Sequence, residues 1–238
     1  MHRLLDLVSA LAARFPNHEY LANLLAEIRT RRSHFAEIRA YSRALNILDD
    51  ESWNNLRATA TQRFRETQGP RGQAAVFDIL NAAVAYRHLK NKGYNYIRCL
   101  PEASSKNAPK NPDIHYRARN EDRYCEVKTF HTSDHELRRS RLLSFNTRVY
   151  DRLPTRFFTR KLNPVFANAV TQLGGATRGI IFAIIHFDDI SPFNRARYKE
   201  QLAQHFQDYW SEVEIYVRFG IDTAQFMHHV PAGARADA

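Results

Sequence analysis

Three side chains in the middle of the chain have the types and the spacing that phosphodiester hydrolysis needs. Asp113 follows Pro112, and after twelve intervening residues come Glu126, Val127 and Lys128. Two carboxylates close together repel one another unless a positive charge lies between them. Mg²⁺ supplies that charge, because it takes one or two carboxylates and keeps several waters. Such an ion polarises a phosphoryl oxygen and activates a bound water, while Lys128 would serve the attacking water or the charged phosphate.

The spacing predicts that these residues meet on a β-hairpin. Glu126 and Lys128 are two residues apart, so on a strand their side chains leave the same face. If the hairpin turns between Arg119 and Asn120, Asp113 lies opposite Glu126, at a Cβ separation of about 4.5–5.5 Å. We therefore expect both carboxylates and the ammonium on one patch. The alternative is an ordinary hairpin, with Asp113 in a turn and Glu126 and Lys128 as a surface ion pair.

The run from Pro112-Asp113 to Glu126-Val127-Lys128 resembles the signature of the PD-(D/E)xK nuclease superfamily. The resemblance extends over about half of the chain, residues 73–187, where we expect a helix, three strands, a helix and a further strand. It implies a restriction-endonuclease-like core in which Asp113, Glu126 and the backbone carbonyl of Val127 hold Mg²⁺. In the same resemblance Lys128 serves the nucleophile, and Mn²⁺ can substitute for Mg²⁺.

Many members of that family carry a further acidic residue on the first helix of the core. Here that helix offers Asp78, which lies about four turns before Gly93. Asn81 and Gln73 are weaker substitutes on the same helix, and Glu102 is a candidate just after the first expected strand. The sequence therefore leaves two candidates for a third metal-binding carboxylate, Asp78 and Glu102.

The densest run of basic residues follows the hairpin. Arginines at 148, 152, 156 and 160 repeat every four residues, which would stack them along one helix face, although Pro154 interrupts such a helix. We expect this segment to bind the phosphates of nucleic acid. The alternative is a solvated basic helix whose aromatic residues belong to the core. The candidate binding residues are Arg138, Arg139, Arg141, Arg148, Arg152, Arg156, Arg160 and Lys161.

The charge of the chain indicates a polyanionic partner. Of 238 residues, 35 are basic and 25 acidic, which gives a formal net charge of +10, and 28 of the basic residues are arginines. The guanidinium presents a planar fork of donors that matches phosphate. Twelve of the basic residues fall between Arg117 and Lys161, around and just after the hairpin. The alternative is that the charge serves only solubility.

Several classes of protein are excluded by the composition and the motifs. No apolar run approaches the roughly 20 residues that a membrane-spanning helix needs. Cys99 and Cys125 are too few for a disulfide framework and fit a reducing compartment. Phosphate-binding glycine loops and a Gly-x-Ser-x-Gly motif are both missing from the sequence. We expect a cytoplasmic protein that does not associate with membranes.

The hydrophobic pattern predicts an α/β protein, with a mixed sheet flanked by helices and an all-α unit before it. Four helical stripes precede Gly69-Pro70-Arg71-Gly72, and the first comprises Leu4, Leu7, Val8, Leu11 and Phe15. The elements expected after that boundary are a helix at 73–92, strands at 94–100, 113–117 and 123–130, a helix at 163–173, a strand at 178–187, a helix at 194–210 and a strand at 212–219. The predicted domains are a helical unit at 1–68, a nuclease-like core at 69–224 and a tail at 225–238.

These features together predict a Mg²⁺-dependent nuclease whose substrate is nucleic acid, with DNA and internal cleavage favoured. The helical unit would contribute substrate binding or dimerisation, so a homodimer belongs to the prediction. Two alternatives share the fold. One is an enzyme that cleaves RNA or tRNA, and the other is a nucleic-acid-binding module whose nuclease site has decayed. The order of elements does not choose among them, because one fold supports many functions.

Overall fold

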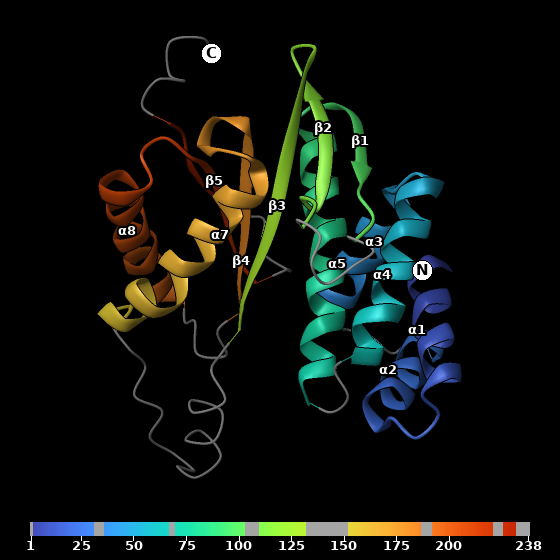
Figure 1. Ribbon diagram of the computed structural model, residues 1–238. Helices are drawn as coiled ribbons and strands as arrows, with labels where there is room; N and C mark the ends of the chain where they lie inside the picture. Colours follow the sequence, from blue (N-terminus) through green and yellow to red (C-terminus); the bar gives the residue numbers. More distant parts are fainter. Residues whose placement is uncertain are drawn as a thin grey trace, which may run out of the picture. The chain divides into compact units, whose positions relative to one another are not determined.

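The computed structural model describes residues 2–30, 36–66, 70–102, 110–131, 152–186, 192–220 and 226–231, with the backbone only at 65–66, 70–76, 131 and 192–194. The chain divides into two compact units, Met1–Val127 and Lys128–Ala238. The described strands form a mixed six-stranded sheet in the order β1-β2-β3-β4-β5-β6, flanked by helices (Figure 1). The predicted α/β class with a mixed sheet is therefore confirmed.

The first unit begins with amphipathic helices, as the sequence predicts. They are α1 (His2–Arg14), α2 (Glu19–Arg29), α3 (Ala36–Ile47) and α4 (Asp50–Glu66). In α1 the apolar residues that repeat at helical spacing are all buried, namely Leu4, Leu7, Val8 and Leu11. Each such side chain contributes roughly 1.5–3 kcal/mol when it is fully buried. The apolar stripe, and not helix propensity, therefore holds these short helices in place.

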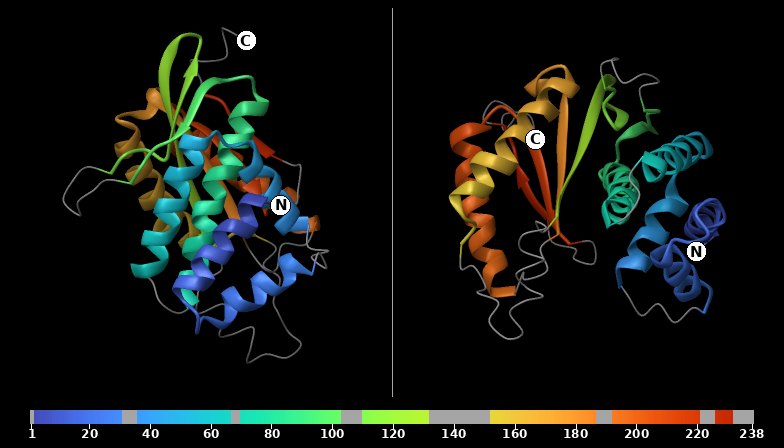
Figure 2. Two further views of the ribbon diagram at one scale, coloured as in Figure 1. Left: turned by 90° about the vertical axis from the view of Figure 1, so that its right-hand side faces the viewer. Right: turned by 60° about the horizontal axis from the view of Figure 1, so that its bottom comes forward.

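Helix α5 (Pro70–Asn91) is apolar on most of its sides because other elements surround it. It packs against α3 and α4 and also against strands β1 (Asn95–Cys99) and β2 (Ile114–Ala118). Figure 2 shows α5 between the other helices and these strands. Its buried apolar residues include Ile79, Leu80, Ala83, Val84 and Leu89. The helix is followed by Gly93 at φ +82°, a left-handed conformation that favours glycine.

Strands β1, β2 and β3 (Glu121–His131) pair in an antiparallel manner. One face of the β1–β2–β3 sheet is apolar and buried, and it comprises Ile97, Cys99, Ile114, Tyr116 and Cys125. Between β2 and β3 the chain turns at Arg119 (φ +51°) and Asn120 (φ +67°). Two central residues with positive φ make the tight turn whose twist matches that of the flanking strands. The predicted hairpin and the predicted position of its turn are both confirmed.

The two cysteines are free thiols, as expected for a chain without a disulfide framework. Cys99 pairs with Ile114, and Ile114 pairs with Cys125, so one strand lies between them. Strands are about 4.8 Å apart, which places the thiols near 10 Å, beyond the reach of a disulfide. Burial, with the nearby charges of Asp113 and Asp49, raises the pKa of Cys99 to about 12. This thiol is therefore protonated at neutral pH.

The second unit is built on a parallel pair of strands. Strand β4 (Gly179–His186) pairs in parallel with β5 (Glu214–Phe219), and residues 179–185 of β4 are all buried. A continuous apolar run is typical of a parallel strand that is covered on both faces. Strand β6 (Phe226–His229) adds to β5 in an antiparallel manner. The sequence prediction left residues 226–229 in a tail, because four residues are too few to show a clear alternation.

Helices cover one side of this parallel pair. A π-helix, η1 (Phe157–Leu162), runs directly into α7 (Asn163–Leu173), and α8 (Pro192–Tyr209) lies beside α7 (Figure 2). Helix α7 ends at Gly174, with φ +74°. A one-turn helix, η2 (Ala176–Arg178), then leads into β4. The bounds of α7 are those that the sequence predicts.

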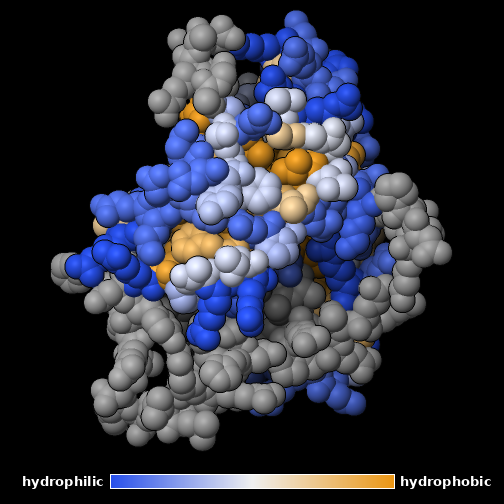
Figure 3. All heavy atoms as spheres, turned by 60° about the vertical axis from the view of Figure 1, so that its left-hand side comes forward, coloured by the Kyte–Doolittle hydropathy of each residue, from blue (hydrophilic) through white to orange (hydrophobic). Residues whose placement is uncertain are grey.

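On the face that Figure 3 shows, most of the described residues are hydrophilic, and hydrophobic residues appear only in small areas. Among the described residues, the exposed large hydrophobic side chains are Tyr96 and Tyr209, at 66% and 67% exposure. None of the helices in the described ranges is both long and apolar enough to cross a bilayer.

Candidate functional site

The hairpin register places Asp113 opposite Glu126. Ile114 pairs with Cys125 and Ala118 pairs with Glu121, so paired residue numbers sum to 239 along the ladder. Strand β2 begins at Ile114, whereas β3 continues to His131. Asp113 and Glu126 therefore lie where the ladder between the two strands ends.

The two carboxylates bridge the strands by reciprocal hydrogen bonds. The backbone N–H of Val127 donates to Oδ2 of Asp113 at 2.8 Å, and the backbone N–H of Asp113 donates to Oε2 of Glu126 at 3.2 Å. Each side chain thus accepts from the opposite strand, in place of a backbone carbonyl. Hydrogen bonds from backbone N–H groups favour the ionised form of a carboxylate. The arrangement fixes both acidic side chains at one end of the hairpin.

Burial sets this pair apart from a surface ion pair. Glu126 is only 2% exposed, and Asp113 is partly exposed. Lys, Glu, Arg and Asp are almost never fully buried in proteins unless they are paired. An ordinary hairpin with a solvated Glu126 is therefore not what the structure has. A buried carboxylate beside a second carboxylate has the electrostatic character of a cation site.

Lys128 belongs to the second unit and is held there by an amide. Its Nζ donates to Oε1 of Gln172 on α7 at 2.8 Å. The Nδ2 of Asn168, one turn earlier on α7, donates to the same oxygen at 3.4 Å. An amide oxygen accepts from the ammonium and so orients it on α7. Gln172 is thus a candidate site residue that the sequence prediction did not include.

Neither candidate for a third acidic ligand joins the carboxylate pair. Oε1 of Glu102 accepts from Nε of Arg63 at 3.0 Å, and both side chains are about one-third exposed. Asn81 is fully buried and accepts a hydrogen bond from the hydroxyl of Tyr41. Asp78 lies partly exposed on α5. Within the described ranges, no three His, Cys, Asp or Glu side chains are grouped so that they could hold a metal ion.

The oxygen atoms of Asp113, Glu126 and Val127 are of the chemical type that Mg²⁺ binds. Asp113 and Glu126 supply carboxylate oxygens, and the carbonyl of Val127 lies between Glu126 and Lys128 in the same strand. Mg²⁺ prefers oxygen ligands and commonly uses only one or two carboxylates, with waters in the other positions. The reciprocal hydrogen bonds bring these two carboxylates to one end of the hairpin. A two-carboxylate Mg²⁺ site is therefore compatible with the hairpin.

Only half of the predicted basic segment lies in the described residues. Arg138, Arg139, Arg141 and Arg148 lie outside them. Arg152 and Arg156 are exposed and lie on either side of Pro154, which is followed by η1, so the four-residue repeat does not continue through one helix. Arg160 and Lys161 lie within η1, 12 and 11 residues before Gln172, which is about 17 Å along a helix axis at 1.5 Å per residue. Arg160 and Lys161 therefore lie several helical turns before Gln172, the residue that accepts from Lys128.

Two aromatic residues of the basic segment, Phe157 and Phe158, pack against other aromatic rings of the second unit. Phe157 is buried against Phe130, with ring centroids 5.8 Å apart. Phe158 packs on His205 at 4.6 Å. Phe157 therefore belongs to the core, as the alternative prediction has it, whereas Phe158 is partly exposed.

A different carboxylate of the first unit, Asp49, accepts hydrogen bonds from two helices. It precedes α4, where its Oδ1 accepts from the backbone N–H of Ser52 at 2.7 Å. Its Oδ2 accepts from the hydroxyls of Ser52 and Tyr86, both at 2.9 Å. Ser52 also accepts from the backbone N–H of Cys99 at 3.0 Å. This network joins α4, α5 and β1 through one helix cap.

Comparison with known proteins finds no relative of this chain. No protein-family model matches the chain, and no curated protein or solved structure is detectably similar to it. The functional argument therefore rests on the chemistry of the residues themselves.

Proposed function

We propose that the protein is a Mg²⁺-dependent nuclease that hydrolyses phosphodiester bonds in nucleic acid, with DNA as the substrate and internal bonds as the targets. One observation carries the proposal. Asp113 and Glu126 lie at opposed positions of the hairpin and are fixed by reciprocal hydrogen bonds to backbone N–H groups. The restriction-endonuclease-like character of the core, inferred from the PD-(D/E)xK resemblance, belongs to the same proposal.

Each residue of the site has a separate task in this proposal. Asp113, Glu126 and the carbonyl of Val127 would hold Mg²⁺, and Mn²⁺ can take its place. The bound ion supplies polarisation of the phosphoryl oxygen and a lowered pKa for the attacking water. Lys128 carries the positive charge that orients this water or stabilises the charge developing on the phosphate. Gln172 holds the ammonium through its amide oxygen.

A second candidate function has one observation in its favour. A third acidic side chain does not join the pair in the described ranges, and Glu102 is engaged by Arg63. A nucleic-acid-binding module that has lost nuclease activity would tolerate this. It would also tolerate the loss of charge at Asp113 and Glu126, whereas a nuclease would not.

The test compares two matched substitutions on strand β3. Glu126→Gln keeps an oxygen that accepts from the N–H of Asp113 but removes the charge, and Glu121→Gln makes the same change at an exposed residue that pairs with Arg123. We expect Glu126→Gln and Lys128→Ala each to lower the cleavage rate at least about 100-fold, and Glu121→Gln to leave it unchanged. The measurement is cleavage of end-labelled duplex DNA, single-stranded DNA and RNA with Mg²⁺ or Mn²⁺.

The outcomes separate the candidate functions. Cleavage of RNA only would replace the DNA substrate by RNA within the same mechanism. Cleavage that persists in excess chelator, or in both variants, would overturn the proposal. Tight binding without cleavage in either metal would favour the binding module.

A further inference from the structure

We propose that the outer face of the β1–β2–β3 sheet binds an unpaired base of single-stranded nucleic acid, with Tyr96 as the stacking surface. Arg98 and Arg117 are the cations beside it. The inference deepens the proposed function, since it rests on a nucleic-acid substrate, but it does not depend on cleavage. The residues involved all belong to the first unit.

A β-bulge turns Tyr96 outwards. The pairing of β1 with β2 shifts by one residue between Asn95 and Arg98, so Tyr96 and Ile97 form the bulge, and Tyr96 is the residue with positive φ. Its φ is +50°, a left-handed conformation that a residue with a bulky side chain adopts only under strain. Bulges of this kind redirect a side chain. Here the bulge leaves the ring 66% exposed, while its neighbour Ile97 is buried in the core.

An oriented cation lies over the exposed ring. Cζ of Arg117 is 4.9 Å from the centroid of Tyr96. Nε of Arg117 donates to Oδ1 of Asp122 at 2.8 Å, and Nε2 of His115 lies 3.0 Å from the same oxygen. Asp122 therefore anchors the guanidinium above the ring. A ring and a guanidinium plane held together are the groups on which unpaired bases stack.

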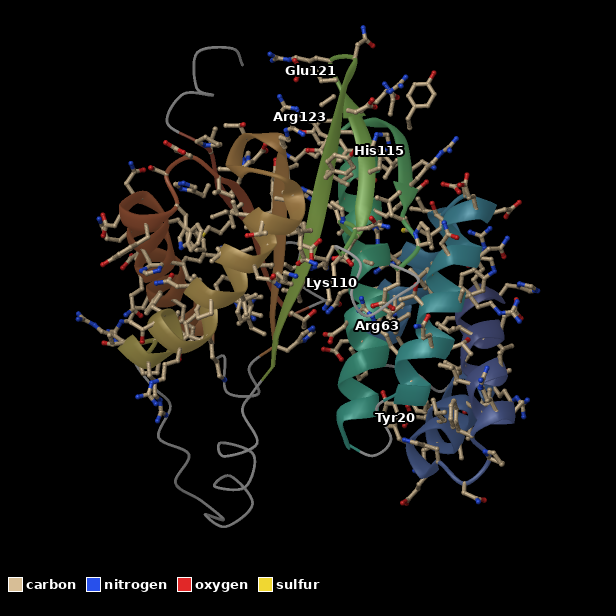
Figure 4. All side chains as sticks on the ribbon, viewed as in Figure 1. Tyr20, Arg63, Lys110, His115, Glu121 and Arg123 are labelled. Carbon is tan, nitrogen blue, oxygen red and sulfur yellow. The ribbon has the colours of Figure 1, made fainter. Side chains whose placement is uncertain are left out.

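The strand register places further groups that could contact nucleic acid on the face of the sheet that carries Arg117. His115 pairs with Tyr124 and with Arg98, and Arg117 pairs with Asp122. Paired residues in an antiparallel sheet share a face, so Arg98 and Tyr124 lie on the face that carries Arg117. Arg98 is 56% exposed and lies 3.5 Å from Glu51, a loose contact that a phosphate could replace. Figure 4 labels His115 on this hairpin.

The distance to the carboxylate pair suits one strand of nucleic acid. Arg117 lies on β2, four residues after Asp113, which directly precedes that strand, so the two are about 13 Å apart at 3.3 Å per residue. At the 3.4 Å per nucleotide of a stacked strand this is about four nucleotides, and an unstacked strand covers it with fewer. A base on Tyr96 and a scissile phosphate at Asp113 and Glu126 would therefore belong to the same short stretch.

The occupant is an unpaired base and not a duplex. Bases in a duplex already stack on one another, and each would have to leave the stack to reach a ring on the protein. Stacking on an aromatic side chain is tolerant of sequence, because every base has a π-face. If this face instead bound a protein partner, substitution of Tyr96 would not change the binding of single-stranded DNA more than that of duplex DNA.

The test measures binding in chelator, so that it is independent of cleavage. The probe is a fluorescein-labelled 12-nucleotide oligo-dT, with a 12-base-pair duplex and an oligo-U of equal length as further arms. We expect Tyr96→Ala to weaken single-strand binding about 5- to 150-fold and to change duplex binding less than twofold. Tyr96→Phe keeps the ring and should bind like the wild-type chain.

The matched control is Tyr209→Ala. Tyr209 is exposed to the same extent, at 67%, but lies on α8 of the second unit. We expect this variant to bind oligo-dT normally. If oligo-dT binding is unchanged in Tyr96→Ala, or falls equally in Tyr209→Ala, the inference is wrong. Equal loss of duplex and single-strand binding would also overturn it, because backbone contacts would then explain the effect.

A spectroscopic variant tests stacking directly. Tyr96→Trp places an indole on the bulge, and we expect its fluorescence to be quenched when oligo-dT binds. Binding without a change in fluorescence contradicts the inference. Binding that responds to these variants in a chain without cleavage would keep the inference and reject the proposed catalysis.

Discussion

Two groups of carboxylates in the first unit differ in how their charge is satisfied. Asp49 is exposed before α4 and accepts three hydrogen bonds, from the backbone N–H and the hydroxyl of Ser52 and from the hydroxyl of Tyr86. Asp113 and Glu126 each accept a backbone N–H across the hairpin, and Glu126 is buried. The first group is complete within the protein. The second places two carboxylates at one end of the hairpin, the arrangement that the proposed Mg²⁺ site needs.

The comparison separates a carboxylate that stabilises the fold from a pair that is suited to chemistry. Loss of some of its hydration raises the pKa of Asp49. The hydrogen bonds from Ser52 and Tyr86 lower this pKa by more, so it lies below its ordinary value. Its charge also lies at a helix N-terminus, where an anion is favourable. Substitutions at the two places should therefore change different observables, and three predictions follow from that difference.

The largest expected effect is on cleavage. Asp113→Asn keeps an oxygen that can accept from the N–H of Val127 but removes one charge of the pair. We expect the cleavage rate to fall at least about 100-fold. Asp49→Asn should leave the rate unchanged. The measurement is single-turnover cleavage of labelled DNA with Mg²⁺.

The stability of the two variants provides the control for this comparison. Removing one of two adjacent like charges relieves repulsion, so Asp113→Asn should unfold at a temperature no lower than that of the wild-type chain. A loss of cleavage accompanied by unfolding would show that Asp113 is structural, like Asp49.

The next effect is on the free energy of unfolding. Asp49→Ala removes the cap of α4 and leaves the buried hydroxyls of Ser52 and Tyr86 without this acceptor. We expect a loss of about 2 kcal/mol, from the cap and from the unsatisfied hydroxyls together. Urea unfolding followed by circular dichroism measures it. A loss below about 0.5 kcal/mol would mean that the network contributes little to the fold.

The smallest effect is on the pH dependence of stability. The pKa of Asp49 is lower in the folded chain than its ordinary value of 3.8, so near that pH the unfolded state binds more protons. The stabilisation from Asp49 is therefore complete above about pH 4 and is lost as the pH falls through the folded pKa. The difference in stability between the wild-type chain and Asp49→Ala should shrink below pH 4. A constant difference between pH 3 and pH 6 would contradict this.

The hairpin could be predicted from the sequence because its information is local. Ile114, Tyr116 and Cys125 follow the alternation that the buried face requires, and Asn120 readily adopts the positive φ of a tight turn. These residues determine the register, and the register alone brings Asp113 opposite Glu126. The helices were predictable for the same reason, since their apolar stripes repeat within a few residues.

The partners of the site could not be predicted, because they depend on contacts between distant parts of the chain. Gln172 is 44 residues from Lys128, and no pattern near either residue indicates their hydrogen bond. The bulge at Tyr96 also lacks the glycine that usually signals a positive φ. The boundary predicted at residues 68 and 69 lies outside the described residues, and that division into domains stays a prediction.

The reactivity of the two buried thiols in the β1–β2–β3 sheet can be used to measure local opening of the chain. Cys99 and Cys125 lie on the buried face of that sheet, with α5 packed against β1 and β2. A thiol reagent reacts with the thiolate, and at Cys99 both burial and the raised pKa oppose its formation. Modification in the native chain therefore requires the sheet to separate from the helix. Its rate gives the free energy of that opening next to Asp113, without any added probe.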